Sequence, residues 1–302
     1  MGGIIILKKA DFSANNIGSI TILSERTKKV LSKMTQYGEH SSEATHLNNY
    51  IAALETNGFI GNNGLIKHLF IPALAGNDNE LLMDIATLDE GGYPTDKRSE
   101  ELKVATTKSV VSWQKGGKTI GLRCLYPTSG MTVTEYNNQS TIVVDLFKNV
   151  GDAYDSFTMF TFGNIISNEN NDKYLSNRSN NSRVYLGAKN ALVEALGTSN
   201  KASVNFTKTS EVGYIAISYK STEGISANVA GCAISDVTAT GDLTKISINA
   251  DADKFLLGSA VYAESRNLAS HVFGFSDYMT AAQTSNFIQL TKDFLGNIGI
   301  NL

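Results

Sequence analysis

The feature that most constrains the fold is a run of short apolar segments between residues 103 and 262, separated by Gly, Asn and Asp. Residues 213–219, GYIAISY, alternate between two faces with the period of a β-strand. Such segments recur roughly every 8–12 residues, which is typical of an all-β sandwich. The sequence therefore predicts strands at residues 108–113, 119–126, 131–136, 141–147, 157–162, 183–186, 202–206, 213–219, 230–237, 243–248 and 255–262. The Asn- and Ser-rich residues 164–182 are predicted to form a surface loop.

The first hundred residues have a mixed pattern that predicts helices and one buried strand. Ser24 is a candidate N-cap for a helix that ends at Gly38. A second helix begins at about Ser42 and ends at Gly58, and residues 65–71 form a strand. These elements lead into the strand-rich region.

Two capping-box patterns predict further helices. Asn77 and Glu80 have the spacing of a box before a short helix over residues 78–85. Thr280 and Gln283 have the same spacing before an apolar helical face. The chain is therefore predicted to be mainly β, a two-sheet sandwich with N-terminal helices and a C-terminal closing helix.

The first residues predict a separate arm. Residues 4–7, Ile-Ile-Ile-Leu, form a short apolar strand that has to be covered by its own sheet or by a partner. We therefore divide the chain into an N-terminal arm, residues 1–24, and residues 25–302, a helical lead-in with the sandwich. The apolar run is too short for a signal peptide, and lysines follow it instead of preceding it.

Charge and hydropathy exclude two classes of partner. The formal net charge is −3 and the pI is about 5.9, which argues against binding duplex DNA through a broad basic surface. No segment approaches the roughly 18 consecutive apolar residues of a membrane span. We expect no nucleic acid and no membrane among the partners.

Sequence motifs give no support for catalysis. The nucleophile-elbow, phosphate-loop and dinucleotide-binding motifs are absent, and the residues of Gly116-Gly117-Lys118 fit a hairpin turn. The histidines lack metal-site spacing; they are His40, His46, His68 and His271. Sugar hydrolysis needs paired carboxylates, and the sequence pattern offers only single acids, at Glu135, Asp145, Asp152 and Asp155. The prediction is a protein that is not an enzyme, although acids distant in sequence can converge in space.

Carbohydrate binding requires less: an aromatic platform with a few amides and carboxylates. Five aromatic residues border the predicted strands and the polar loop, namely Trp113, Tyr126, Tyr136, Tyr154 and Tyr185. They are the candidate ligand-binding residues, with core packing as the alternative for each. Ca²⁺ is compatible with such a site, but no motif supports it, and we predict no cofactor.

Three segments carry a family resemblance. Residues 48–58 and 65–75 resemble the lead-in of concanavalin A-like jelly rolls in phage virion proteins, and residues 272–299 resemble the last strand and closing helix of the same family. Residues 4–18 are similar to N-terminal segments of appendage proteins from phages of gut Bacteroidales, including crAss-like phages. The resemblance implies a lectin-like jelly roll, and the acids of the family's glucanases have no counterpart here.

The resulting hypothesis is a virion structural or appendage protein, a head or tail fibre component with a lectin-like domain. It would be made in the host bacterial cytoplasm and reside in the virion. Its expected partners are other virion proteins through the arm, further copies of itself as a dimer or trimer, and host-surface glycan. The alternatives are a carbohydrate-binding module of other origin and a glycan-cleaving enzyme.

Overall fold

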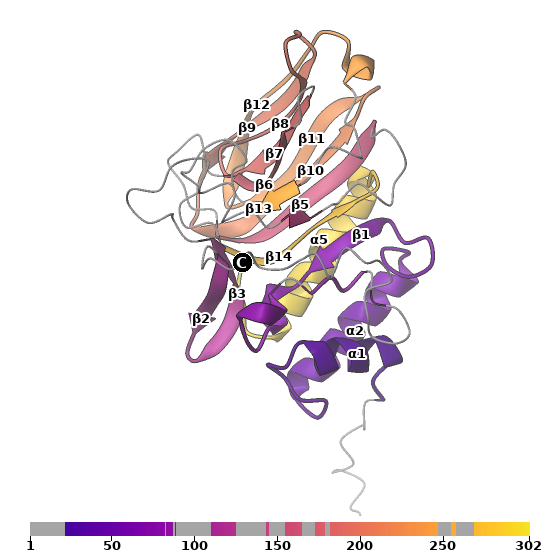
Figure 1. Cartoon of the computed structure of the whole chain (residues 1–302), viewed down its shortest axis with the longest axis vertical. Helices are drawn as coiled ribbons and strands as arrows, with labels where there is room; N and C mark the ends of the chain where they lie inside the picture. Colours follow the sequence, from indigo (N-terminus) through magenta and orange to yellow (C-terminus); the bar gives the residue numbers. More distant parts are fainter. Residues whose placement is uncertain are drawn as a thin grey trace, which may run out of the picture.

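The computed structural model describes residues 22–81, 83–86, 88, 110–124, 143–144, 155–164, 173–178, 182–246, 255–257 and 269–302. These residues form two antiparallel seven-stranded sheets with three α-helices (Figure 1). The predicted mainly β architecture, with helices before the strands and a helix after them, is confirmed.

The first sheet is built around the buried strand β14. Along its path the sheet runs through β11 (Gly224–Ala230), β10 (Val212–Lys220), β5 (Ser156–Asn164), β14 (Ala269–Ser276), β3 (Lys118–Cys124) and β2 (Val110–Lys115). The seventh strand, β1 (Ile66–Phe70), also pairs with β14. β14 therefore pairs with β5 along one side. Along its other side it pairs with β3 at Ala269 and Ser270, and then with β1 from Phe273 to Ser276.

The second sheet runs in the order β12 (Cys232–Thr240), β9 (Lys201–Lys208), β8 (Asn190–Ala195), β7 (Ser182–Gly187), β6 (Lys173–Arg178), β13 (Phe255–Leu257) and β4 (Val143–Val144). Gly231, at a φ of 77°, joins β11 of the first sheet to β12 of the second. This left-handed backbone conformation is readily available to glycine. One residue thus carries the chain from the edge of one sheet to the edge of the other.

Three capped helices form a third layer. α1 (Glu25–Lys33) and α2 (Ser42–Thr56) have N-caps Ser24 and Ser41, and α5 (Ala281–Asn297) has the predicted capping box of Thr280 and Gln283. α2 packs against α5, whose Phe287 ring lies 4.5 Å from that of Phe160, measured between centroids. α5 therefore covers the first sheet on the side away from the second sheet, with α2 packed on α5 and α1 on α2 (Figure 1).

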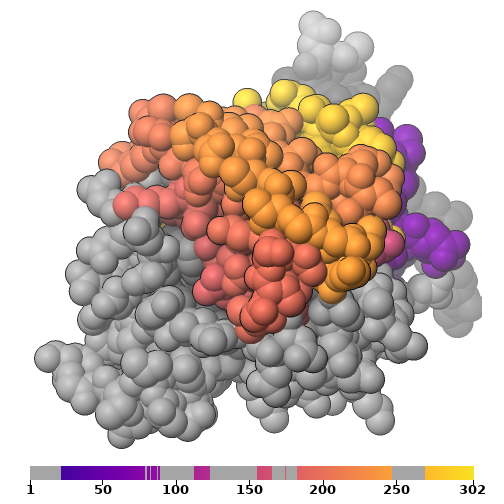
Figure 2. Space-filling model, turned by 90° about the horizontal axis from the view of Figure 1, so that it is seen from above, coloured from indigo at the N-terminus to yellow at the C-terminus, as the bar shows by residue number. Residues whose placement is uncertain are grey.

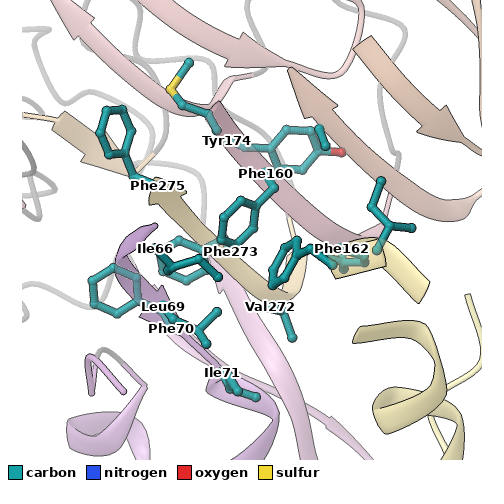
Figure 3. Packing of buried hydrophobic residues seen from close by; sticks show 14 of the residues in the cluster. Ile66, Leu69, Phe70, Ile71, Phe160, Phe162, Tyr174, Val272, Phe273 and Phe275 are labelled. Atoms are coloured by element: carbon teal, nitrogen blue, oxygen red, sulfur yellow. The ribbon is translucent and has the colours of Figure 1, made fainter. Parts of the chain in front are cut away.

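Both faces of the first sheet are buried at its centre. On β10, Tyr214, Ala216 and Ser218 share the helix-facing side, as the alternating sequence predicts. Ile215 and Ile217, fully buried, lie on the opposite side. Figure 3 shows the same close packing where β1 meets β14, with the Phe70 and Phe273 rings stacked 4.8 Å apart between centroids.

Four sequence-based expectations were wrong in detail. The predicted polar loop contains β6, because pairing with β7 and β13 outweighs the low strand propensity of its Asn and Ser residues. The predicted strand at residues 230–237 is two strands divided at Gly231. The predicted helix over residues 78–85 is a single 3-10 turn, Asp78–Glu80, and the predicted strand at residues 243–248 begins with another, Leu243–Lys245.

The first helix also ends earlier than predicted, at Lys33 instead of Gly38. Met34 has an extended conformation, and the main-chain N–H of Thr35 donates to the Glu80 carboxylate at 2.7 Å. The Gln36 side chain bonds to the main-chain oxygens of Ala73 and Thr119. These long-range bonds hold the segment away from helical geometry. The predicted strands at residues 4–7 and 131–136 lie outside the described residues, so the division at residue 24 stays a prediction.

Candidate functional site

The candidate site is a pocket of about 310 Å³ between β10, β11 and the first turns of α5. Its polar lining comes from Ser218, Ser226, Asn228 and Thr284, and Ile234 of β12 closes one side. None of the residues lining it is charged. The volume is at the lower end of the range for small-molecule sites.

The pocket exists because small side chains stand opposite one another on the helix-facing side of the sheet. Ala216 pairs with Asn228, and Ser218 pairs with Ser226. Paired residues of antiparallel strands project from the same face, so these four short side chains lie together. The next residue along that face, Tyr214, is large and packs on Phe162. The change from Tyr to Ala and Ser leaves the hollow beside α5.

Two polar groups in the pocket have hydrogen-bonding capacity left within the described structure. The Asn228 amide accepts from the Tyr214 hydroxyl at 3.2 Å and donates to the Ser285 hydroxyl at 3.2 Å. One further N–H and one lone pair of this amide remain for a ligand. The Ser226 hydroxyl donates weakly to the Ser218 carbonyl at 3.5 Å, so its lone pairs also remain.

A charged group lies at the turn that joins the two strands. Lys220 and Glu223 form an ion pair, and the Tyr278 hydroxyl donates to Glu223 at 3.1 Å. Hydrogen bonds from Lys220 and then from Tyr278 hold the pKa of Glu223 below its usual value. Glu223 therefore stays ionised near neutral pH, while the pocket itself is uncharged.

The structure describes two of the five aromatic residues predicted to bind a ligand, and it places them in different sheets. Trp113 is half-buried on β2, at the opposite end of the first sheet from the pocket, with its ring stacked 4.5 Å from that of His271. Tyr185 is buried on β7 of the second sheet, where its hydroxyl accepts from Asn190. Tyr126, Tyr136 and Tyr154 lie outside the described residues. The role of the five aromatic residues in ligand binding stays a prediction.

The pocket residues were not predicted from the sequence. Alternation placed Ser218 on the correct face, but β11 was not predicted as a strand, so Ser226 and Asn228 had no assigned partners. The nearest available signal was the stretch of small residues after Gly224, which contains no bulky side chain before Ile234 except Ile225 and Val229.

Two histidines are buried in the described structure. His68 is bonded through Nδ1 to Asp84 at 2.6 Å. Nδ1 of His271 bonds to the main-chain oxygen of Ile120, and burial lowers the pKa of His271 to about 4. Within the described ranges no cluster of three His, Cys, Asp or Glu side chains is arranged to hold a metal ion. Asp155, the one described member of the four single acids, is exposed at the start of β5.

Comparisons with known proteins find no sequence relative. No protein family and no curated protein matches the sequence. Among solved structures, the botulinum neurotoxin serotype G binding domain matches 63% of the chain with 11% identity and a TM-score of 0.42. The binding domain of Paraclostridial Mosquitocidal Protein 1 matches 62% with 13% identity and a TM-score of 0.39. The matched part spans 46% of each of these chains. Among the described residues, no helix combines the length and apolar character needed to cross a membrane.

Proposed function

We propose that this protein is a lectin-like component of a phage particle and that it binds a neutral sugar of the host surface in the pocket beside α5. The observation that carries the binding proposal is the uncharged pocket, in which the Asn228 amide and the Ser226 hydroxyl have hydrogen-bonding capacity left for a ligand. The segment resemblances support the placement in a virion appendage.

A neutral sugar matches the chemistry of the pocket. Its hydroxyls are both donors and acceptors, as are the Asn228 amide and the Ser226 hydroxyl. Its C–H surfaces suit the apolar walls formed by Ala216 and Ile234. A charged ligand would lose its hydration without gaining a counter-charge from the lining, which is unfavourable.

Replacing Asn228 with alanine is expected to weaken sugar binding about fivefold, because a hydrogen bond to the ligand contributes on the order of 1 kcal/mol. The measurement is a glycan array with the full chain, followed by titration calorimetry on the best sugar. The matched control is Asn205→Ala on β9, which removes an amide bonded to Asp236 and leaves the pocket unchanged.

A second variant separates binding from folding. Asn228 also bonds to Tyr214 and Ser285, whereas Ser226 is exposed and makes one weak bond. Ser226→Leu should fill the pocket mouth and reduce binding while the unfolding temperature stays close to that of the unmodified chain. Loss of binding in Trp113→Ala, with both pocket variants unaffected, would place the site on the aromatic residues instead. A chain that binds no glycan would overturn the proposed binding function.

The virion assignment has its own test. The chain should be present in purified particles of the phage that encodes it, at a copy number that is a multiple of the local symmetry. Mass spectrometry of washed particles measures its presence, and electron microscopy of the particle measures its position. Absence from particles while the protein accumulates in infected cells would contradict a structural role.

A further inference from the structure

β12 is an exposed edge strand. It pairs with β9 on one side, and no described strand pairs with its other side. After the buried Cys232, every residue of β12 is exposed. Figure 2 shows the orange segment that contains β12 on the outer surface of the molecule. The row of main-chain N–H and C=O groups along this edge is a template for another strand.

The composition of this edge offers little protection against pairing, and a β-bulge between Ile234 and Asp236 interrupts only its first part. Residues 224–240, which contain β11 and β12, carry one charged side chain, Asp236, and contain neither Lys nor Pro. Monomeric proteins commonly place such residues on exposed edges to block association. Ile234 and Val237 are instead 43% and 52% exposed. Depletion of charge around exposed apolar residues is typical of an interface.

The hydrogen-bond register identifies which groups point outward. Phe206 donates to the Lys189 oxygen, and Ala195 donates to the Asn200 oxygen, so the even-numbered residues of β9 bond to the β8 side. The odd-numbered residues of β9 therefore bond to β12. Their partners include Asp236 and Thr238.

From Asp236 to Thr240, on the C-terminal side of the bulge between Ile234 and Asp236, the main chain alternates in direction. The N–H and C=O groups of Val237 and Ala239 consequently point away from β9. A partner strand has to place its own outward-pointing residues opposite these two.

We infer that β12 pairs antiparallel with β12 of a second copy of this chain, about a two-fold axis through Thr238. An isologous contact requires a self-complementary surface, and this register provides one. The outward groups of Val237 face those of Ala239 in the other copy, and Asp236 lies opposite Thr240, a hydroxyl. A shift of the axis to Asp236 would place two carboxylates opposite each other, which is unfavourable. Charge and hydrogen bonding therefore select a second copy in one register.

The test is the oligomeric state of the full chain, measured by sedimentation velocity across a dilution series. The unmodified chain should form dimers that dissociate on dilution. Val237→Lys places an ammonium group on each side of the axis and should raise the dimer dissociation constant at least about 100-fold. The control, Thr207→Lys, adds the same charge at an exposed position of β9 and should leave it unchanged.

A cross-link checks the register. On the axis, the two Thr238 residues form a non-hydrogen-bonded pair with Cα atoms about 4.5 Å apart, within the span of a disulfide. Thr238→Cys should therefore form a reducible covalent dimer under mild oxidation, whereas Val237→Cys and the unmodified chain should form little. A monomer at every concentration, or a dimer that neither Val237→Lys nor Thr238→Cys affects, would overturn the inference. Both outcomes are independent of glycan binding.

Discussion

Asp84→Ala is expected to lower the free energy of unfolding by about 3–5 kcal/mol, because it leaves buried partners without an acceptor. The Asp84 side chain is 1% exposed. One carboxylate oxygen bonds to His68 at 2.6 Å, and the other accepts from the main-chain N–H groups of Leu69 and Ala86 at 3.0 and 3.1 Å. The loss is measured by urea denaturation followed by near-UV circular dichroism.

The neighbouring residue supplies a matched control. Lys67, next to His68 on β1, pairs with Asp277 at 2.9 Å, but both side chains are partly exposed. Asp277→Ala should therefore cost less than about 1 kcal/mol. Asp84→Asn keeps an oxygen for the main-chain donors and should fall between the two. Equal losses of unfolding free energy for Asp84→Ala and Asp277→Ala would show that burial of the His68–Asp84 pair does not decide how much the pair contributes to stability.

The elements that sequence predicted well are those specified by local signals. The capping box at Thr280 and the alternation from Tyr214 to Tyr219 depend on residues a few positions apart, and both were confirmed. The glycine pair Gly116–Gly117, at φ values of 60° and 79°, forms the predicted hairpin turn between β2 and β3. Local chemistry was sufficient for these elements.

The elements that sequence predicted poorly depend on distant partners. β6 has a polar composition and becomes a strand because β7 and β13 bond to its two sides. The first helix ends at Lys33 because Glu80, distant in sequence, accepts from Thr35. No window of a few residues contains that information.

The candidate site was unpredictable for a similar reason. Sequence reasoning favours large aromatic residues as sugar ligands, but Trp113 packs on His271 and Tyr185 is buried in the second sheet. The pocket arises instead from small residues on two paired strands beside a helix that comes more than fifty positions later in the chain. A hollow is defined by what surrounds it, so its location requires the tertiary structure.

His271 is expected to make the stability of the fold depend on pH. Its side chain is 2% exposed on β14, with Nδ1 bonded to the Ile120 carbonyl of β3 and its ring stacked on Trp113. In the neutral ring, Nδ1–H donates to that carbonyl. Burial lowers the pKa of His271 from 6.5 to about 4, because the imidazolium would lose its hydration.

Stability should therefore fall as the pH decreases from 6.5 toward 4. In this window the unfolded chain binds a proton at His271 and the folded chain does not, so protonation favours unfolding. The neutral His271 contributes about 3 kcal/mol of stability at pH values above the pKa of the unfolded chain. This contribution is lost as the pH falls through the pKa of the folded chain. Urea denaturation at a series of pH values measures the slope.

His271→Asn isolates this contribution. The asparagine N–H can replace Nδ1–H as the donor to Ile120, but the side chain does not titrate. The variant should be less stable than the unmodified chain near neutral pH, since it loses the stacking on Trp113. It should also lose less stability on acidification, by up to about 3 kcal/mol. The control is His40→Asn, at an exposed histidine, which should keep the full pH dependence. Parallel pH profiles for His271→Asn and the unmodified chain would show that His271 is not the group whose protonation destabilises the fold.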